Sequence, residues 1–338
     1  MLETIKELSL INATSGREKA VRDYIISKIE GKCEYRTDAL GNLIVFKKGK
    51  KEPKNKIMLD AHMDEVGIIA TYINSDGTIK FGTVGGIDTK VILGRQFVFE
   101  NGAVGVVGVK PVHLLSSDER TKIPDADSLC IDIGVSSKEE AAKRVKIGET
   151  AVFVSDFVQF GNCKIKAKAL DDRVGCAILI DMINSELEYD CYFSFSVQEE
   201  IGLRGAATSA YGIAPDYAIV LETTTAADII DVPDHKKVCK LGDGAAVSFM
   251  DRSTLYSKEL FDTAFRVAGE KGIKIQPKTV IAGGNNAGAI HKSRGGIKTI
   301  TVNTPCRYLH SPSCVCDTRD IESARALAEA LVENFANA

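Results

Sequence analysis

Residues 191–206, CYFSFSVQEEIGLRGA, determine how the rest of the chain is interpreted. The alternating side chains at its start predict a strand. This strand runs into two adjacent carboxylates, Glu199 and Glu200, before a glycine-rich turn. Adjacent ionised carboxylates repel each other, so either both are solvated or a positive group, such as Arg204 or a metal ion, neutralises one of them. A charged corner between a strand and a helix is the ordinary explanation, and other motifs are needed to favour a catalytic one.

The composition is that of an ordinary globular protein. Of the 338 residues, 44% are hydrophobic and 26% are charged, and this length allows about two domains around a large core. The net charge of −3 gives no reason to expect binding to nucleic acid or to an anionic membrane. No apolar run approaches about 20 residues, the length that spans a bilayer, and the first residues lack the apolar core of a secretory signal. The sequence therefore predicts a cytoplasmic protein without a nucleic-acid or membrane partner.

Nine cysteines are scattered along the chain between Cys33 and Cys316. An odd number without a repeating spacing is typical of reduced thiols rather than of a disulfide framework. Cys314 and Cys316 are too close together for the usual zinc knuckle, and there is no second knuckle. We therefore expect structural cysteines and no cysteine nucleophile.

The N-terminal part of the chain predicts helices and strands in alternation. Ser15 and Glu18 form a capping-box pattern before a helix at residues 21–29. Residues 43–46 and 57–59 are predicted strands, and the second runs directly into a polar segment. Ligand sites of open α/β sheets lie at such strand ends, so this segment is a candidate site.

The middle of the chain has a different pattern. Glycine-rich, strand-like runs alternate there with turn signals such as Asn101-Gly102, and one helix is predicted after Ser137. Before and after this region, helices alternate with strands. We therefore predict that residues 67–163 form a small β-rich domain, inserted into a discontinuous α/β domain of residues 1–66 and 164–338.

The second part of the α/β domain again brings polar residues to strand ends. A predicted strand at residues 217–221 ends in Glu222, and a strand at 299–302 precedes a loop that contains His310. Helices are predicted at residues 173–183, from Ser257 onward, and at 318–335.

Imidazole and carboxylate groups collect at these strand ends: His62, Asp64, Asp171, Asp172, Glu199, Glu200, Glu222 and His310. Zinc, cobalt and manganese accept such ligands, and two ions that share a carboxylate form a co-catalytic site. Carboxylates from Asp171, Glu200 and Glu222, with a bridging hydroxide, would balance the charge of two divalent cations. Glu199 is not needed for this balance. It is therefore free to take a proton from the bridging water and pass it to a leaving amine, as a general acid/base.

Two shorter patterns are less specific. A metal-bound imidazole usually donates its other N–H to a carboxylate, and residues two apart in an extended segment project to the same side, so Asp64 can orient His62. A surface turn is the more common explanation of such a tripeptide. Asp171-Asp172 can likewise be only a helix N-terminus, where acidic side chains favour the helix dipole.

Five motifs together resemble those of a known family. In chain order they are AHMDEVG (61–67), ALDDRVG (169–175), QEEIGLRGA (198–206), VLETTTAAD (220–228) and RYLHSP (307–312). Over essentially its whole length, the chain resembles the M42 family of metallo-aminopeptidases, including a β-rich insertion between the first two motifs. The resemblance implies a zinc-peptidase-like three-layer α/β/α catalytic domain. It also implies a co-catalytic two-metal aminopeptidase that removes N-terminal residues from peptides.

The resemblance implies roles for individual residues. One divalent ion, zinc or cobalt or else manganese, would be held by His62, Asp171 and Glu222. The other would be held by Asp171, Glu200 and His310. In related two-metal peptidases the first of the paired acids bridges the metals and a cis peptide links it to the next, which favours Asp171 as the bridge and leaves Asp172 as the alternative. The hydroxide between the metals would be the nucleophile, with Glu199 as general base and Asp64 behind His62.

The resemblance also implies an assembly. Dimers would form through the inserted β-rich domain and join into a dodecameric tetrahedral shell that admits unfolded peptides. Of the remaining histidines, His291 would lie near a subunit or substrate edge. His113 and His235 are expected in ordinary loops.

Two positions depart from the usual pattern of the family. Asn285-Asn286 stands where many relatives have Thr-Asp, so an amide replaces a charge near the expected substrate side. Glu222 stands where many relatives have aspartate, and its extra methylene can alter the position of a metal ion. We expect these differences to affect specificity more than chemistry.

Three other functions agree with parts of this set. A carboxypeptidase or deacylase with the same metal pair would need a basic group for a substrate carboxylate, and Arg307 is the candidate substrate-binding residue. An endoglucanase would use twin carboxylates, but it would need neither the histidines nor the third acid, and the chain has no Trp for a sugar platform. An inactive scaffold protein would have lost a ligand, and none is missing.

Overall fold

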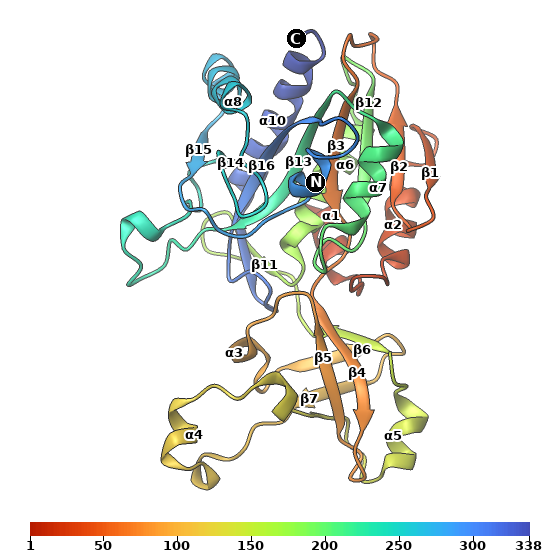
Figure 1. Cartoon of the computed structure of the whole chain (residues 1–338), viewed down its shortest axis with the longest axis vertical. Coiled ribbons are helices and arrows are strands. Elements are labelled where there is room, and N and C mark those ends of the chain that lie inside the picture. The colour runs from red at the N-terminus through yellow and green to blue at the C-terminus, as the bar shows by residue number, and fades with distance from the viewer.

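An eleven-stranded sheet runs through the larger part of the molecule (Figure 1). The computed structural model describes residues 1–338. Neighbouring strands follow the order β1 (Glu34–Thr37), β2 (Leu43–Lys47), β12 (Cys191–Ser196), β3 (Ile57–His62), β13 (Tyr217–Thr225), β16 (Lys298–Arg307), β17 (Cys314–Asp317), β11 (Lys164–Ala167) and β10 (Val158–Phe160). The two remaining strands lie beside β16, which pairs with β14 (Ala245–Ser248), and β14 in turn pairs with β15 (Ile275–Lys278).

The centre of this sheet is parallel, and this brings the polar strand ends together. Strands β12, β3, β13 and β16 pair in parallel, with Ser196 of β12 opposite His62 of β3. Asp60 of β3 is opposite Val220 of β13, so two residues further on His62 and Glu222 reach the same level. The carboxyl ends of these strands therefore form one edge, where ligands bind in open α/β sheets.

Helices cover both faces of the sheet. On one face the buried core contains side chains of α1 (Leu2–Leu10), α2 (Lys19–Ile29), α6 (Leu170–Asn184), α8 (Lys258–Lys271) and α10 (Thr318–Phe335). On the other face a separate core contains side chains of α7 (Arg204–Ile213) and α9 (Ala287–Ile290). This arrangement confirms the predicted three-layer α/β/α fold. No helix is both long enough and apolar enough to cross a bilayer.

The inserted β-rich part is a closed barrel below the sheet in Figure 1. Its strands follow the order β4 (Gly67–Ile73), β5 (Ile79–Val84), β8 (Ile131–Asp132), β7 (Val104–Val107), β6 (Gln96–Phe99) and β9 (Thr150–Phe153). The barrel has a hydrophobic core of its own and carries α3 (Thr89–Ile92), α4 (Ser117–Thr121) and α5 (Lys138–Arg144). Strand β10 belongs to the large sheet, although the boundary predicted from the sequence places it with the barrel.

Local signals of the sequence differ in how well they predicted the structure. Ser137 caps α5 through the backbone N–H of Glu140, as predicted. The capping box at Ser15 is wrong, because α2 begins at Lys19 and the Ser15 hydroxyl donates instead to Asp64 at 2.5 Å. All nine cysteines are free, as expected.

The central strands are longer than predicted, so His62 and Glu222 lie within β3 and β13 rather than after them. Side-chain alternation stops where the polar residues begin. The backbone nevertheless continues to pair with strands on both sides, as the register of β13 with β16 shows up to Thr225. Backbone pairing in a central strand does not depend on side-chain polarity.

Candidate metal centre

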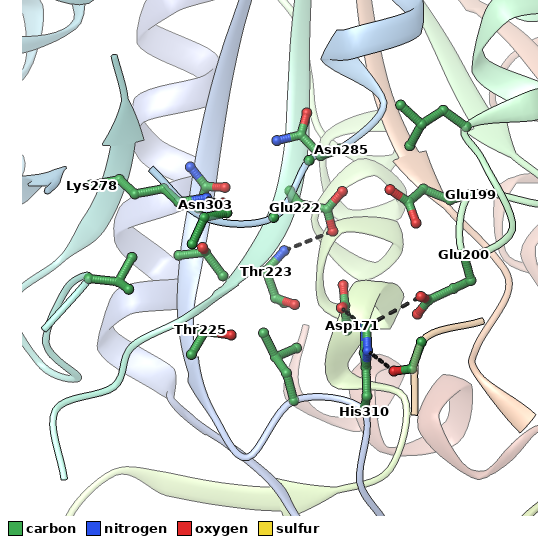
Figure 2. A pocket seen from close by; sticks show the side chains of 18 of the residues that line it. Asp171, Glu199, Glu200, Glu222, Thr223, Thr225, Lys278, Asn285, Asn303 and His310 are labelled. Carbon is green, nitrogen blue, oxygen red and sulfur yellow. Dashed lines mark hydrogen bonds and ion pairs between the residues drawn. The ribbon is translucent and has the colours of Figure 1, made fainter. Parts of the chain in front are cut away.

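The predicted ligands converge at the carboxyl edge of the sheet, on a cavity of about 620 Å³ (Figure 2). Asp171, Glu199, Glu200, Glu222 and His310 all line this cavity. His62 lies behind them at the end of β3, with 1% of its surface exposed. The sheet, the N-terminus of α6, the loop after β12 and the loop between β16 and β17 each supply part of the cluster.

Asp171 stands between the two histidines. Its Oδ1 is 3.3 Å from Nε2 of His62, and its Oδ2 is 3.4 Å from Nε2 of His310. Each imidazole has a second carboxylate nearby: Oε1 of Glu222 is 3.4 Å from His62 Nε2, and Oε2 of Glu200 is 3.3 Å from His310 Nε2. One carboxylate thus belongs to two groups of three side chains.

These separations fit bound ions. In both histidines Nδ1 faces a backbone carbonyl, that of Asp64 at 3.1 Å or that of Gly86 at 2.5 Å. A carbonyl can only accept, so Nδ1 donates a proton to it, and Nε2 is the nitrogen that faces the carboxylate oxygens and would bind an ion after losing its own proton. Ligand atoms about 2.0–2.1 Å from a tetrahedral zinc ion are roughly 3.3–3.4 Å from one another. Imidazole nitrogen and carboxylate oxygen also suit cobalt and manganese.

The buried carboxylates of the cluster also need a cation to balance their negative charges. Burial raises the pKa of Glu200 and of Glu222 to about 8. Burial also acts on Asp171, but hydrogen bonds from His310 and His62 outweigh it and hold the pKa of Asp171 well below its usual value. None of these carboxylates pairs with Lys or Arg, and the buried Oε2 of Glu222 has no hydrogen-bond partner. The donor set therefore fits divalent metal ions.

The second acid of the ALDDRVG motif has a different environment. The peptide bond between Asp171 and Asp172 is cis, as the resemblance implied, and regular helical geometry in α6 begins after it. Oδ1 of the fully buried Asp172 accepts the backbone N–H of Gly175 at 3.0 Å. Its Oδ2 has no hydrogen-bond partner. One oxygen of this carboxylate lies within 4.8 Å of ligand atoms of His62 and Glu222, so Asp172 stays the alternative ligand on that side.

Asp64 links the strand end of β3 to the loop after β12. Its carboxylate accepts the backbone N–H of Glu199 at 3.0 Å and that of Glu200 at 3.2 Å. The nearest carboxylate oxygen is 3.5 Å from Nδ1 of His62. Asp64 therefore fixes the backbone of both glutamates, which the sequence did not predict, in addition to lying against the imidazole.

Glu199 lines the same cavity and lies above Glu200 in Figure 2. Burial raises the pKa of Glu199 well above its ordinary value, and the negative charges of Glu222 and Glu200 raise it further. A carboxyl group with a raised pKa is suited to both accepting and donating a proton near neutral pH.

The side chain of Arg307 forms an ion pair outside the cavity. Its guanidinium forms a bidentate ion pair with Asp228, at 2.6 and 2.8 Å, and it is not among the residues that line the cavity. The ammonium that does line it is that of Lys278, which is 4% exposed and donates to the carbonyl of Ala282 at 3.0 Å. Sequence reasoning missed Lys278, because a lysine beside a proline near the end of a short strand has no distinctive pattern.

The side chains of Asn285 and Asn286 mainly form hydrogen bonds within the protein. Nδ2 of Asn286 donates to Asp60 at 2.7 Å and to Ser196 at 2.8 Å, beneath the cavity. Asn285 lines the cavity, and its Oδ1 accepts the backbone N–H of Ala287. The expected effect of this pair on the substrate side therefore falls on Asn285 alone.

Asn286→Asp is expected to lower the free energy of unfolding at pH 8 by about 2 kcal/mol. It would place two buried carboxylates against each other, and the pKa of Asp60 is already raised to about 6 by burial. The two carboxylates would share a proton in the folded state, with a pKa higher than in the unfolded state. The folded state would therefore bind this proton more tightly, so the stability lost at pH 8 should return as the pH falls towards 5. Urea unfolding at both pH values measures this. Asn12→Asp at an exposed position is the control, and an equal loss in both variants would contradict the prediction.

The other histidines lie away from the cluster. Nδ1 of His291 is 2.6 Å from the carbonyl of Ala287, and the ring does not line the cavity. His113 and His235 are exposed in short 3-10 turns.

Comparison with known proteins places this geometry in a family. Residues 41–327 match the family model described as M42 glutamyl aminopeptidase. The lysyl aminopeptidase of Pyrococcus furiosus is 33% identical over 347 residues, which cover 98% of this chain and 97% of that protein.

Solved structures agree with the sequence comparison. An aminopeptidase from the archaeon Desulfurococcus kamchatkensis is 34% identical with a TM-score of 0.93, covering 98% of this chain and 94% of that one. The TET1 peptidase of Pyrococcus horikoshii, which can assemble into a tetrahedron or a large octahedral shell, is 36% identical with a TM-score of 0.85 and 98% coverage of both chains. The chain therefore belongs to the M42 family of aminopeptidases.

Proposed function

We propose that this chain is a co-catalytic two-metal aminopeptidase that hydrolyses N-terminal residues from peptides. The main support is the position of Asp171, whose two oxygens face different histidines, each accompanied by its own second carboxylate. His62, Asp171 and Glu222 would hold one divalent ion, and Asp171, Glu200 and His310 the other. When bound, zinc, cobalt or manganese ions there would acidify a water molecule and polarise the scissile carbonyl.

Glu199 would transfer the proton. It would accept a proton from the attacking water as the new C–O bond forms, and donate it to the nitrogen of the leaving amine as the C–N bond breaks. Asp64 would keep this carboxylate in place through the backbone N–H of Glu199, and would keep the neighbouring ligand in place through that of Glu200.

One assay separates this function from its alternatives. Purified protein, treated with chelator and then with or without Zn²⁺ or Co²⁺, is tested on free peptides, N-acetylated peptides and cellulose oligomers. We expect hydrolysis of free peptides only, lost on chelation and restored by metal. Cleavage of N-acetylated peptides would indicate the carboxypeptidase or deacylase, cleavage of cellulose oligomers the endoglucanase, and no turnover at all the inactive scaffold. Activity that is indifferent to chelation would contradict the metal-dependent mechanism.

Lys278 supports a preference within this reaction. It is the only Lys or Arg side chain that lines the cavity, and burial lowers the pKa of its ammonium, so a negative partner would stabilise its charged form. An acidic side chain on the N-terminal residue of the substrate would supply that partner. We therefore propose that the enzyme prefers N-terminal Glu or Asp.

Lys278→Met is expected to lower kcat/KM for glutamyl substrates by about 10- to 100-fold relative to leucyl ones, since a hydrogen bond to a charged group contributes about 1.5–3 kcal/mol. The measurement is hydrolysis of matched glutamyl, leucyl and lysyl peptides by both proteins. Lys236→Met, at an exposed position without an ion pair, is the control. An unchanged ratio of glutamyl to leucyl hydrolysis would rule out Lys278 as the determinant.

The barrel supports a homo-oligomer built through this domain. Large apolar side chains are exposed on and after β7, namely Val104, Val106, Val109, Val112 and Leu114. A patch of this kind is typical of a contact between protein chains. We propose that these residues form a dimer contact and that dimers assemble further into a dodecamer, which light scattering of the purified protein measures directly.

A further inference from the structure

The barrel reaches the metal centre through residues 85–91, which follow β5 and run into α3. We name these residues the β5–α3 segment. Helix α3 lies on the side of the barrel that faces the large sheet (Figure 1). Gly86, Asp88 and Val91 of this segment line the same cavity as Glu200 and His310. The wall of the cavity is therefore built from both domains.

One contact links this segment directly to a predicted ligand. Nδ1 of His310 donates to the carbonyl oxygen of Gly86 at 2.5 Å. This bond keeps Nδ1 occupied and directs Nε2 at Asp171 and Glu200, at 3.4 and 3.3 Å, so Nε2 is the nitrogen available to an ion. The partner of a ligand's second nitrogen sets both the tautomer and the orientation of the ring.

The two histidines differ in what holds them. His62 is a residue of the central strand β3, is 1% exposed, and finds its Nδ1 acceptor two residues along its own chain. His310 lies in a loop with φ of 56°, which is uncommon for a residue with a side chain, and 33% of its side chain is exposed. Its orientation depends on the barrel, whereas that of His62 does not.

We infer that the β5–α3 segment is a positioning element of the metal centre, with the carbonyl of Gly86 holding His310 in place for the ion that it shares with Asp171 and Glu200. This inference rests on the proposed two-metal function. It gives the barrel a role in the site that is independent of any contact between subunits. The ion on the His62 side is independent of this segment.

The substitution Gly85→Ala adds a single methyl group that would disturb the segment. A Cβ at this position, where φ is 81°, would lie 2.9 Å from Cγ1 of Val66 and 3.2 Å from Cβ of Glu200, so either the backbone of the segment or these neighbours must shift. Gly94 lies in the same barrel with φ of 68° and no atom within 4 Å of its Cβ position. Gly94→Ala therefore has comparable backbone strain without the clash.

The test measures metal affinity on the full chain. Zn²⁺ binding is followed by competition with a chelator, and thermal unfolding of the metal-free protein is recorded for each variant. Gly85→Ala should weaken one of the two sites by about 10- to 100-fold, the usual effect of losing the partner of a metal-bound histidine, and leave the other site unchanged. Gly94→Ala should bind both ions as the unsubstituted protein does.

Equal affinities in Gly85→Ala and Gly94→Ala would overturn the inference, as would an equal weakening of both sites in Gly85→Ala. If Gly85→Ala does not fold, Asp88→Ala replaces it with the same two criteria. Asp88 accepts the backbone N–H of Lys90 at 2.9 Å at the start of α3, so its loss loosens the segment without a clash. If the unsubstituted protein binds no divalent ion, the proposed function itself is overturned. If the unsubstituted protein and Gly85→Ala both bind two ions with equal affinity, only the positioning role is overturned.

Discussion

Replacing Glu199 with glutamine is expected to lower kcat for peptide hydrolysis by roughly 10²–10⁴-fold, the usual contribution of a positioned general acid/base. Glutamine has the same shape and keeps the backbone N–H that Asp64 accepts, but it cannot take up a proton. The two ions should therefore remain bound. Steady-state kinetics on a free peptide and metal analysis of the same sample measure both effects.

Glu200→Gln is the matched comparison for this substitution. It changes the next residue by the same atoms, yet it removes a carboxylate that faces His310 at 3.3 Å. It should lower metal content as well as activity, and added metal should restore part of the activity. The assigned roles are exchanged if Glu199→Gln loses the metal and Glu200→Gln keeps it, and a fully active Glu199→Gln would exclude Glu199 as the base.

Replacing Arg173 with leucine is expected to lower the free energy of unfolding by about 3 kcal/mol, because it removes a buried charge that lies beside Glu65 and donates to three backbone carbonyls. Lys168, 2.7 Å from Glu65, would remain as the other partner of this carboxylate. Arg173 is 0% exposed. Its guanidinium lies 3.4 Å from Glu65 and donates to the carbonyls of Leu8, Ile11 and Met63 at 2.5, 3.0 and 2.9 Å. Leucine would leave the carbonyl of Met63 without this donor, while the carbonyls of Leu8 and Ile11 would keep the backbone N–H of Ile11 and the ammonium of Lys168, at 3.2 Å each.

Urea unfolding of the metal-free protein measures this loss without a contribution from bound ions. Arg95→Leu is the control, since Arg95 is exposed and forms no ion pair, and a surface change of this kind usually stays within about 0.5 kcal/mol. If Arg173→Leu is as stable as Arg95→Leu, the arginine of the ALDDRVG motif does not stabilise the fold.

The sequence was informative where function and local structure coincide. Acids and histidines that follow apolar runs predicted the edge of the sheet at which the cluster lies, because parallel strands end together. The motif that contains Asp171 predicted the shared position between His62 and His310. The alternation of helices and strands predicted an α/β domain with an inserted β-rich part. The resemblance to the M42 family implied the three-layer arrangement of that domain.

Contacts between distant segments could not be predicted in this way. Gly86 meets His310 across 224 positions, and Asn286 meets Asp60 across 226. No periodicity or motif spacing connects such residues, because their contact exists only after distant segments of the chain have packed together. The capping box at Ser15 failed for the same reason, as a buried carboxylate from another segment competes successfully for its hydroxyl.

The closure of the barrel restricts how copies of this protein can meet. All six of its strands have a neighbour on each side, and the pairing is shortest at β8, which meets β5 at one position and β7 at two. A closed barrel has no outer edge strand, so side-chain packing is the contact that we expect to cover the apolar side chains on β7. At the open side of the large sheet, β1 exposes Glu34 and Arg36, and charges on an edge strand discourage such extension. The closed barrel thus favours contacts between copies that use side chains over contacts that pair their backbones.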